Sequence, residues 1–557
     1  MLRAGTAALI FILMSAAGHG ADEYVGSKAC AGCHPKLYAQ YRGTPMGRSI
    51  EAANAPDVLA TVATPVTVHS GKLDRYFEVF SKDSKLYQTE YAVANGVRVF
   101  ENTYKLDYMA GSGQNGRTPL VGRGDFLVEA PLSYYAKANL WGLSPGFETA
   151  DYGFNRPIHE ACIRCHCGKP NAVAGRNGLY EKEPFQEMAI GCENCHGPGG
   201  AHVRARTHGV RIAGRDITIV NPRRLPPRLA EDICMMCHQG GDTRVLQPGK
   251  QYADFRPGNP LYKTLAILKV APRERSAGDA DLLEHHAAMK LSKCFRASGG
   301  KLSCLTCHDP HTAPAGEEAV AYYRQRCFQC HTEASCQVPF RQRGGNCIGC
   351  HMPKRAIAEI SHSALTNHRI VARPGEPLPA DYYSQSTPGL PGILYLNAPP
   401  GGPELPILTR FAAYGELQAK APDLAKDYPK AFAAARTAFP NDPLVLAAVG
   451  RQALLEGRYP DAIQALQKSV SSGTPSSVWL LDLARALKLA GQEPDAVPVL
   501  QRAAALDPFD TTIQKTLILA YIDLHDYTHA RAALQSYVAS FPEDSLMRGL
   551  LHKVEPR

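Results

Sequence analysis

The chain has 557 residues, of which 45% are apolar and 20% charged, and its formal net charge is +9. This length is too great for one hydrophobic core and predicts two or three domains. The composition is ordinary for a soluble globular protein. The positive charge is not gathered into a run of Lys and Arg or a basic helix, so it does not indicate nucleic-acid binding.

The first 21 residues are typical of a secretory signal peptide. Arg3 supplies a positive start, the apolar core runs from Ala7 to Ala17, and small residues follow up to Ala21, where cleavage is expected. An uncleaved membrane anchor is the alternative, but a spanning helix needs about 20 apolar residues. No later segment is long and apolar enough to cross a bilayer. We therefore expect a periplasmic or otherwise secreted protein whose mature chain has no transmembrane segment.

Cysteine usage carries the clearest chemical information. Seventeen cysteines in an exported chain ordinarily suggest disulfides, but fourteen of them lie in seven copies of the pentad Cys-x-x-Cys-His. In this pentad the two thiols add to the vinyl groups of one haem, and the adjacent His presents its imidazole to the iron. Zinc ribbons and redox disulfides are the alternatives, but neither needs His directly after every second Cys.

The sequence therefore predicts seven covalently attached haem c groups. We number the pentads as motifs 1 to 7 in chain order. Their thiols are Cys30 and Cys33, Cys162 and Cys165, Cys192 and Cys195, Cys234 and Cys237, Cys304 and Cys307, Cys327 and Cys330, and Cys347 and Cys350. Their proximal iron ligands are His34, His166, His196, His238, His308, His331 and His351.

The sixth ligand of each iron decides its function, because bis-His ligation gives a closed, electron-transferring haem whereas a vacant site allows catalysis. Beside the pentads, the motif-bearing region holds nine further histidines, which are enough for seven irons, and the rest of the mature chain holds three. This enrichment indicates distal ligands. The candidates are His202, His311, His362, His368, His159 and His69.

The spacing of some candidates restricts which iron they can serve. His311 and His202 follow the proximal histidines of motifs 5 and 3 too closely to reach the opposite face of the same iron, so each is expected to serve a neighbouring haem and lock haems into pairs. His285 and His286 are adjacent, and at most one of them is expected to be a ligand. Met46 is an alternative thioether ligand, which would raise the potential of its haem; simple packing is its other interpretation.

Three cysteines, Cys167, Cys294 and Cys336, lie outside the pentads. In an oxidising compartment Cys294 and Cys336 are able to pair, but sequence does not establish connectivity. Buried free thiols are the alternative.

Composition and periodicity divide the chain. Aromatic and β-branched segments between residues 66 and 135 predict a small antiparallel sheet, with strands at 75–80, 85–93 and 97–106. Nine prolines within 374–406 predict an extended linker. Beyond it, small and apolar residues recur every 34 positions, which resembles tetratricopeptide repeats; a generic helical hairpin bundle is the alternative. The recurring residues are Ala462, Ala496 and Ala530, and Leu466, Leu500 and Leu534.

We therefore expect a signal peptide (1–21), a heptahaem cytochrome c domain (22–373), a linker (374–406) and a tetratricopeptide-repeat domain (407–557). The fold class is expected to be mainly α. In this interpretation the haem-packed domain has little regular structure apart from the small sheet, and an α-helical solenoid follows it.

The motif region resembles bacterial multihaem cytochromes c related to the tetrahaem cytochrome of ammonia oxidisers, in a variant with C-terminal tetratricopeptide repeats. The resemblance covers roughly residues 28–371 and rests on the phrases CAGCHPKLYAQYRGTPMGRS, YMAGSGQNGRTPL, CENCHGPGGAH, KLSCLTCHDPH and CIGCHMPKRAIAEISHSALTNHRI. It implies that His202, His311, His362 and His368 are axial-ligand positions. Relatives often carry Asn-His where this chain has Gln114-Asn115, so one histidine ligand of that family is absent here.

The expected function is electron transfer between redox partner proteins by an exported heptahaem c-type cytochrome, with the repeats docking a partner. The alternative is a multihaem reductase of a small nitrogen or sulfur oxyanion with one open haem. No CxxCK pentad of the kind found at nitrite-reducing haems is present, so an enzyme is the less favoured interpretation.

Overall fold

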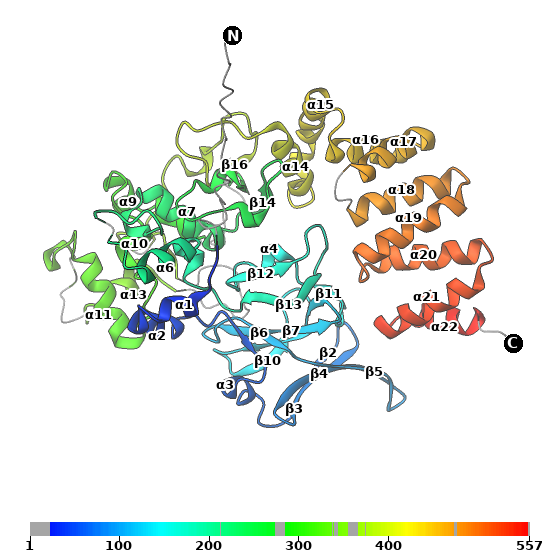
Figure 1. Ribbon diagram of the computed structural model, residues 1–557, viewed down its shortest axis with the longest axis horizontal. Helices are drawn as coiled ribbons and strands as arrows, with labels where there is room; N and C mark the ends of the chain where they lie inside the picture. The colour runs from blue at the N-terminus through cyan, green and yellow to red at the C-terminus, as the bar shows by residue number, and fades with distance from the viewer. Residues whose placement is uncertain are drawn as a thin grey trace, which may run out of the picture.

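The computed structural model describes residues 23–211, 213–272, 284–336, 338, 344–354, 366–373, 375–472 and 476–554. The predicted signal peptide (1–21) and the candidate ligand His362 lie outside the described residues. Three regions are visible in Figure 1: a β-rich region, a group of short helices that carries the motifs, and an array of paired helices that ends at the C-terminus.

A four-stranded antiparallel sheet with the order β2-β3-β4-β5 forms from the aromatic segments, which confirms the three predicted strands. Two-residue turns at Asp83-Ser84 and Asn95-Gly96 join its last three strands, and all four turn residues have positive φ. Such turns match the twist of the flanking strands and favour Asn-Gly. The strands are β2 (Val66–Ser70), β3 (Arg75–Lys82), β4 (Lys85–Ala94) and β5 (Val97–Lys105).

A second, seven-stranded sheet makes the β-rich region larger than the sequence predicted. The two sheets share a core that includes Phe77, Leu86, Met109, Trp141 and Phe154. The fold is 42% helix and 18% strand, so the expectation of a mainly α protein holds only in part, because several antiparallel sheets accompany the helices. The additional strands are β1 (Ile50–Ala52), β6 (Tyr108–Ala110), β7 (Gly116–Arg123), β8 (Phe126–Glu129), β9 (Leu132–Tyr135), β10 (Leu140–Leu143) and β11 (Arg156–Pro157).

The motif-bearing region consists mostly of helices of one or two turns. Between residues 293 and 372, no apolar side chain among the described residues is buried. This part of the chain therefore lacks a side-chain core of its own. The helices are α1 (Ser27–Ala31), α2 (Pro35–Arg42), α3 (Pro56–Leu59), α4 (Glu160–Ile163), α5 (Glu193–His196), α6 (Gly200–Thr207), α7 (Pro227–His238), α8 (His285–Lys290), α9 (Lys293–Ala297), α10 (Cys304–Cys307), α11 (Gly316–Cys327) and α13 (Cys347–His351), with a two-stranded sheet of β12 (Lys169–Ala172) and β13 (Tyr180–Glu187).

The proline-rich segment 374–406 does not form the extended linker that its composition predicted. Its residues Ile393–Tyr395 form β16, which pairs with β15 (Leu265–Val270), and β15 pairs in turn with β14 (Thr243–Leu246). The buried Asn397 side chain extends this sheet, accepting from the Ile267 N–H and donating to the Leu265 carbonyl. The prediction failed because a three-residue apolar strand among prolines has too weak a signal.

The C-terminal region is an array of helices that pack in sequence-adjacent pairs. The predicted 34-residue recurrence is seen in the structure, because Ala462, Ala496 and Ala530 are all buried between helices. The turns between paired helices also recur every 34 residues, with positive φ at Gly457, Gly491 and His525. The helices are α14 (Ile407–Leu417), α15 (Tyr428–Ala438), α16 (Pro443–Leu455), α17 (Tyr459–Ser471), α18 (Ser477–Leu489), α19 (Glu493–Leu506), α20 (Thr511–Asp523), α21 (Tyr527–Ser540) and α22 (Ser545–Val554).

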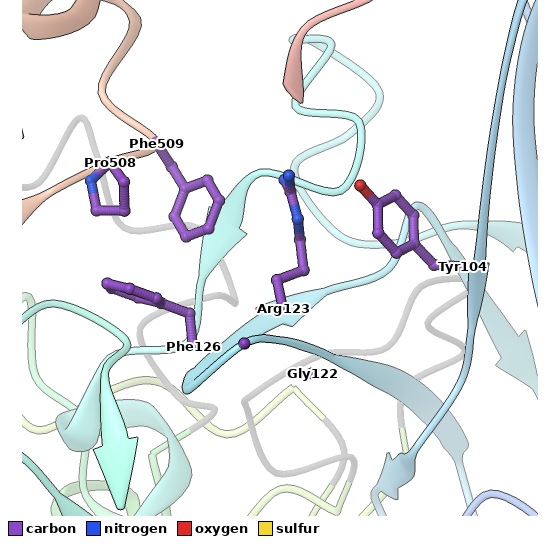
Figure 2. A pocket seen from close by; sticks show the side chains of 7 residues that line it. Tyr104, Gly122, Arg123, Phe126, Pro508 and Phe509 are labelled. Atoms are coloured by element: carbon purple, nitrogen blue, oxygen red, sulfur yellow. The ribbon is translucent and has the colours of Figure 1, made fainter. Parts of the chain in front are cut away.

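Both ends of this array contact the rest of the molecule (Figure 1). At the first end α14 packs on the β14-β15-β16 sheet, and Thr409 Oγ1 donates to Gln247 Oε1 at 2.8 Å. At the other end Asn155 Nδ2 donates to the Ser540 carbonyl at 2.8 Å. Between these contacts, the rings of Phe126 and Phe509 meet edge-on at 5.3 Å beside a pocket (Figure 2). The repeats are therefore held in one orientation.

We predict that Gly450→Ala destabilises the repeat region by about 1–3 kcal/mol, the usual cost of overpacking. A methyl group at Gly450 on α16 would lie 2.5 Å from Leu466 Cγ and 3.2 Å from the Ala462 carbonyl on α17. Urea unfolding followed by circular dichroism measures the change. Gly549→Ala on α22 is the matched control, because nothing lies within 4 Å of its added carbon and alanine favours the helix by up to about 1 kcal/mol. Equal effects of the two substitutions would contradict the close helix contact.

Acidic side chains gather where the end of the array meets the β-rich region. Arg75 Nε lies 3.1 Å from Asp151 and 3.8 Å from the fully buried Glu90. Burial, followed by the neighbouring charges of Asp151 and Glu543, raises the pKa of Glu90 well above its usual range. Burial also raises the pKa of Glu543, on the loop before α22, to about 7.

These raised pKa values predict a pH-dependent contact. The Glu543 carboxyl binds its proton more tightly in the folded protein than in the unfolded chain. Its contribution to the stability of the folded state is therefore complete below the usual carboxyl pKa of about 4.3. This contribution is lost as the pH rises through the folded-state pKa of about 7. Amide hydrogen exchange around residues 540–544 should therefore be slower at about pH 5.5 than at about pH 8, after correction for intrinsic rates. Glu543→Gln should reduce this difference; a difference of the opposite sign would show that the site is not protonated on folding.

Candidate functional site

Each of the seven motifs begins, spans or ends a short helix. Motifs 2, 3, 5 and 7 lie on the one-turn helices α4, α5, α10 and α13, whereas motifs 4 and 6 lie at the C-terminal ends of α7 and α11. A helical turn brings both thiols and the following imidazole to neighbouring positions. All 17 cysteines are free in the structure, so the fourteen pentad thiols are not paired as disulfides.

Motifs 1 and 3 are held together although 162 positions separate Cys30 from Cys192. The Glu193 carboxylate accepts from the Val25 and Gly26 N–H groups at 3.0 and 2.8 Å, just before motif 1. Ser27 Oγ accepts from the Cys192 N–H at 2.9 Å. The thiols of Cys30 and Cys192 hydrogen-bond to each other, which raises the pKa of Cys30.

Motif 2 lies against motif 4. The Cys165 thiol is 3.9 Å from the Met236 carbonyl oxygen. Arg244 on β14 bridges the two, because its Nη2 donates to the same carbonyl at 2.6 Å and its Nη1 lies 3.9 Å from Cys165 Sγ. A hydrogen bond with Cys237 and the charge of Arg244 lower the pKa of Cys165 to about 6, against the opposing effect of burial.

Motif 4 also adjoins motif 5. The Cys304 thiol hydrogen-bonds to Cys234, which raises the pKa of Cys304. The hydrogen bond with Cys165 is the main cause that raises the pKa of Cys237, and burial is the second. The nearby Cys195 of motif 3 adds to the shift. Motif 4 therefore lies beside motifs 2 and 5. Motif 3 also meets the end of motif 2, because Asn194 Nδ2 donates to the Gly168 carbonyl at 2.9 Å.

The last three motifs follow one another in space as in sequence. The Asp309 N–H, one residue beyond motif 5, donates to the Tyr322 hydroxyl on α11 at 3.1 Å. Burial raises the pKa of Cys327 to about 11, and the neighbouring thiols of Cys347 and Cys307 contribute to the shift. Motif 6 thus lies between motifs 5 and 7.

Two predicted distal histidines face proximal histidines at the separation expected for ligands of one iron. A bond from an imidazole nitrogen to a metal is about 2 Å long, so two imidazoles on opposite faces of one iron have ring centroids about 6 Å apart. The centroids of His196 and His311 are 6.1 Å apart, and those of His308 and His368 are 6.2 Å apart. The structure therefore brings His311 to motif 3 and His368 to motif 5.

His285 is a functional candidate that sequence reasoning did not single out. Its ring centroid lies 5.0 Å from that of His238 in motif 4 and 4.4 Å from that of His368. The adjacent His286 is buried and its Nε2 is 3.2 Å from Glu231 Oε2. In the sequence, only the position of His285 and His286 at the start of a helix marked them as candidates. The fold is needed to show that the ring of His285, and not that of His286, faces His238 of motif 4.

Hydrogen bonds at Nδ1 orient the ligand-forming nitrogen of several of these rings. Nδ1 of His196, His351 and His368 contacts backbone carbonyls of Val220, Val371 and Thr366 at 2.7, 2.6 and 3.0 Å. Nδ1 of His311 and His202 contacts carboxylates of Asp309 and Asp216 at 2.9 and 3.0 Å. A partner at Nδ1 fixes the tautomer that leaves Nε2 available for a metal. The rings in these bonds are thus set for ligation through Nε2.

Burial keeps the clustered imidazoles neutral, which is the form that binds a metal. It lowers the pKa of His285 to about 3 and that of His308 to about 4, and neighbouring histidines add to both shifts. Burial is also the main cause that lowers the pKa of His238 and that of His368.

The remaining candidates lie in different settings. The pKa of His196 is lowered mainly by burial. His34 of motif 1 and His202 lie near enough to His196 to add slightly to this shift. His159 accepts from the Ala161 N–H through Nδ1 and caps α4. His69 lies on β2, where its ring stacks on Tyr76 at 4.3 Å. Ligation by His202, His159 and His69 stays a prediction, and only for His202 does a neighbouring motif histidine support it.

The three extra cysteines show no pairing. Cys167 is fully buried in an apolar cluster near Ile163 and Tyr180. Cys294 lies near Cys330 and Cys307, and both Cys294 and Cys336 are free. The structure therefore favours free thiols over a Cys294–Cys336 disulfide.

The donor set fits haem c. Paired thiols stand beside an imidazole in each pentad, facing imidazoles lie about one iron apart at motifs 3 and 5, and residues 293–372 bury no apolar side chain among those described. A porphyrin attached at each pentad would supply the apolar mass that this segment lacks.

Comparisons with known proteins agree with this chemistry. A family model described as a doubled CXXCH motif matches residues 297–335, which contain motifs 5 and 6. The chain is 21% identical over 182 residues to the Multiheme cytochrome MtrA of Shewanella baltica (strain OS185). This match covers 31% of the chain and 53% of that protein, so the chain spans about half the length of this curated relative.

Two solved structures are among those that match parts or most of the chain. The Outer Cell Wall Cytochrome OcwA is 14% identical, with a TM-score of 0.35, over 88% of this chain and 99% of that one. YrrB, described as a TPR protein with an unusual peptide-binding site, is 16% identical, with a TM-score of 0.22, over 25% of this chain and 71% of that one. The motifs, in agreement with the multihaem relative, support covalently bound haem c. The relation to the cytochrome of ammonia oxidisers stays an expectation.

We predict that His368→Ala opens one iron. With its facing ligand removed, the haem of motif 5 should change from low-spin to high-spin in the oxidised protein and bind carbon monoxide once reduced. Electron paramagnetic resonance and difference absorption spectra measure both changes. His208→Ala is the control, because His208 is exposed and its Nδ1 contacts the Arg204 carbonyl. An unchanged spin state in the His368 variant would exclude this histidine as a ligand.

Proposed function

We propose that this chain is an exported heptahaem c-type cytochrome that carries electrons between redox partner proteins, with the repeat region docking one of them. The observation that carries the proposal is the contact between motifs from distant parts of the chain. Ser27, just before motif 1, accepts from the Cys192 N–H of motif 3, and the Cys165 thiol of motif 2 lies 3.9 Å from the Met236 carbonyl of motif 4. Ring contacts of His285 and His368 link His238 of motif 4 to His308 of motif 5. Attachment sites in contact would hold their haems close enough to exchange electrons.

The chain's own residues would hold, orient and shield each group. The pentad thiols would bind the porphyrin, the proximal imidazole would take one face of the iron, and histidines such as His311 and His368 would take the other. Bound haem c supplies a reversible one-electron iron couple. Nδ1 partners such as Val220 and Asp309 keep the imidazole rings in place. Ligation on both faces closes an iron to substrates, which supports a carrier rather than a reductase at motifs 3 and 5.

The repeat region supports a docking role. Its contacts with the β-rich region come from one edge, which includes the loop residue Phe509 and Ser540 at the C-terminal end of α21. At the opposite ends of the helices, Leu455 and Leu489 occupy equivalent positions 34 residues apart and are 82% and 56% exposed. These side chains lie on a helical solenoid, a fold whose extended surface commonly binds other proteins. No helix among the described residues has the length and apolar character needed to cross a membrane.

We predict that the mature protein carries seven haem groups. Because each pentad supplies two thioether bonds, the haems should survive denaturation, and the intact mass should exceed that of the mature apo-chain by seven haem masses. A pyridine haemochrome assay gives an independent count. Fewer than six haems in fully matured protein would contradict the proposal, and carbon monoxide binding to one haem of the unmodified protein would favour the reductase.

A further inference from the structure

A basic surface lies directly beyond motif 3, on α6 and the loop that follows this helix. Between residues 204 and 224 the chain holds six arginines, all of them exposed, and one carboxylate, that of Asp216. Other residues separate these arginines, so they form no run in the sequence. They are Arg204, Arg206, Arg211, Arg215, Arg223 and Arg224.

Half of these positive charges are not neutralised within the chain. Ion pairs are formed by Arg204 with Glu23, by Arg206 with Asp216 and, at 3.9 Å, by Arg223 with Asp309. Among the described residues, no carboxylate lies within ion-pair distance of Arg211, Arg215 or Arg224. A surface of unpaired guanidinium groups attracts a partner of opposite charge and speeds its association.

Two large apolar side chains are exposed among the arginines. Ile217 is 87% exposed and Val210 is 51% exposed. The segment contains no lysine, and this difference matters because arginine is enriched in protein interfaces whereas lysine is depleted there. Arginines around exposed apolar side chains therefore fit a surface that binds another protein.

The inner side of the same loop contacts two imidazoles of the motif region. His202 Nδ1 lies 3.0 Å from Asp216 Oδ2 and 3.5 Å from Thr218 Oγ1. His196 Nδ1, in motif 3, contacts the Val220 carbonyl at 2.7 Å. Ile217 comes between Asp216 and Thr218 in the chain but faces solvent. A protein docked over Ile217 would therefore be separated from these imidazoles by a single layer of chain.

We propose that this basic surface docks an acidic redox protein that exchanges electrons with the haem of motif 3. In the direction of reduction, one electron passes from the reduced centre of the partner to the ferric iron, which becomes ferrous, and the partner is oxidised. The inference rests on the proposed function, because it assumes that motif 3 carries haem. It goes further by giving one redox partner a place and a charge.

The position of the basic surface leaves the repeats free for a second partner. α6 lies among the motif helices, on the opposite side of the molecule from the repeats (Figure 1). A protein on the basic surface and another on the repeats would therefore be bound at the same time. Electrons would enter at one of these surfaces and leave at the other.

The test follows reduction of the oxidised protein by a plant-type ferredoxin, an acidic one-electron donor of low potential, in a stopped-flow spectrometer. Attraction between opposite charges predicts a second-order rate constant that falls as salt is added. Arg211→Glu combined with Arg215→Glu should lower this rate constant at low salt by about tenfold or more and weaken its salt dependence.

Lys82→Glu combined with Lys85→Glu is the matched control. Both lysines are exposed at the turn between β3 and β4, and the substitutions change the net charge by the same amount. They should lower the rate constant by less than about twofold, because salt screens charges that are far from the docked donor. Equal effects of the two pairs would show that the donor responds only to overall charge and would overturn the docking surface.

Intact mass, measured first, separates this inference from the proposed function. Fewer than six haems would contradict the proposed function, whereas seven haems with equal effects of the two pairs would contradict the basic surface alone. Arg211→Gln combined with Arg215→Gln replaces the Glu pair if that pair does not fold, and its expected loss of rate is smaller but still greater than that of the lysine control.

An anionic membrane is the competing occupant of the basic surface. Sedimentation with vesicles of phosphatidylcholine and phosphatidylserine in equal amounts measures this binding, because clustered arginines also attract anionic lipid. The unmodified protein and the Arg211→Glu, Arg215→Glu variant should sediment with the vesicles to the same extent. Loss of vesicle binding in the variant, with an unchanged rate of reduction by ferredoxin, would overturn the protein partner in favour of the membrane.

Discussion

Covalent attachment at the pentads is the constraint on which the motif-bearing half of the molecule depends. A chain normally folds by burying apolar side chains, yet the described residues between 293 and 372 bury none. Helices such as α10 and α13 are single turns whose length is about that of the pentad itself. A single helical turn is unstable alone, because the conformational entropy lost on ordering its residues exceeds the free energy gained from its one or two hydrogen bonds. Thioether bonds and iron ligation would supply the missing free energy, as metal binding does in small metal-dependent domains.

The ligand pairs extend this constraint from single turns to the whole region. His311 follows motif 5 but faces His196 of motif 3, and His368 lies beyond motif 7 but faces His308 of motif 5. Each iron bound in this way would tie together two segments that are distant in sequence. The β-rich region and the repeats, by contrast, have apolar cores of their own, and the repeats lie on the opposite side of the molecule from most of the motif helices (Figure 1).

Sequence reasoning succeeded where a signal is local. The strands β3 to β5 were predicted because aromatic and β-branched residues alternate between turn residues such as Asn95 and Gly96, and the repeats because alanine recurs at contact positions. Reasoning failed where the signal is short or depends on distant segments. Ile393–Tyr395 is too brief a strand to outweigh its prolines, and the extra strands of the second sheet are only two to eight residues long. His311 and His368 were found from their places beside motifs, but their partners, the role of His285 and the contacts between distant motifs depend on packing that no spacing in the sequence reveals.

The measurement that addresses the arrangement most directly is X-ray diffraction from crystals of the mature protein at the iron absorption edge. Anomalous scattering locates each iron without reference to the protein coordinates. Seven peaks are expected, each beside a pentad, with the peak at Cys162–His166 nearest to the one at Cys234–His238 and the peak at Cys30–His34 nearest to the one at Cys192–His196. Irons that follow one another in sequence order, with the second peak between the first and the third, would contradict these contacts between motifs, and fewer than six peaks would contradict the heptahaem assignment itself.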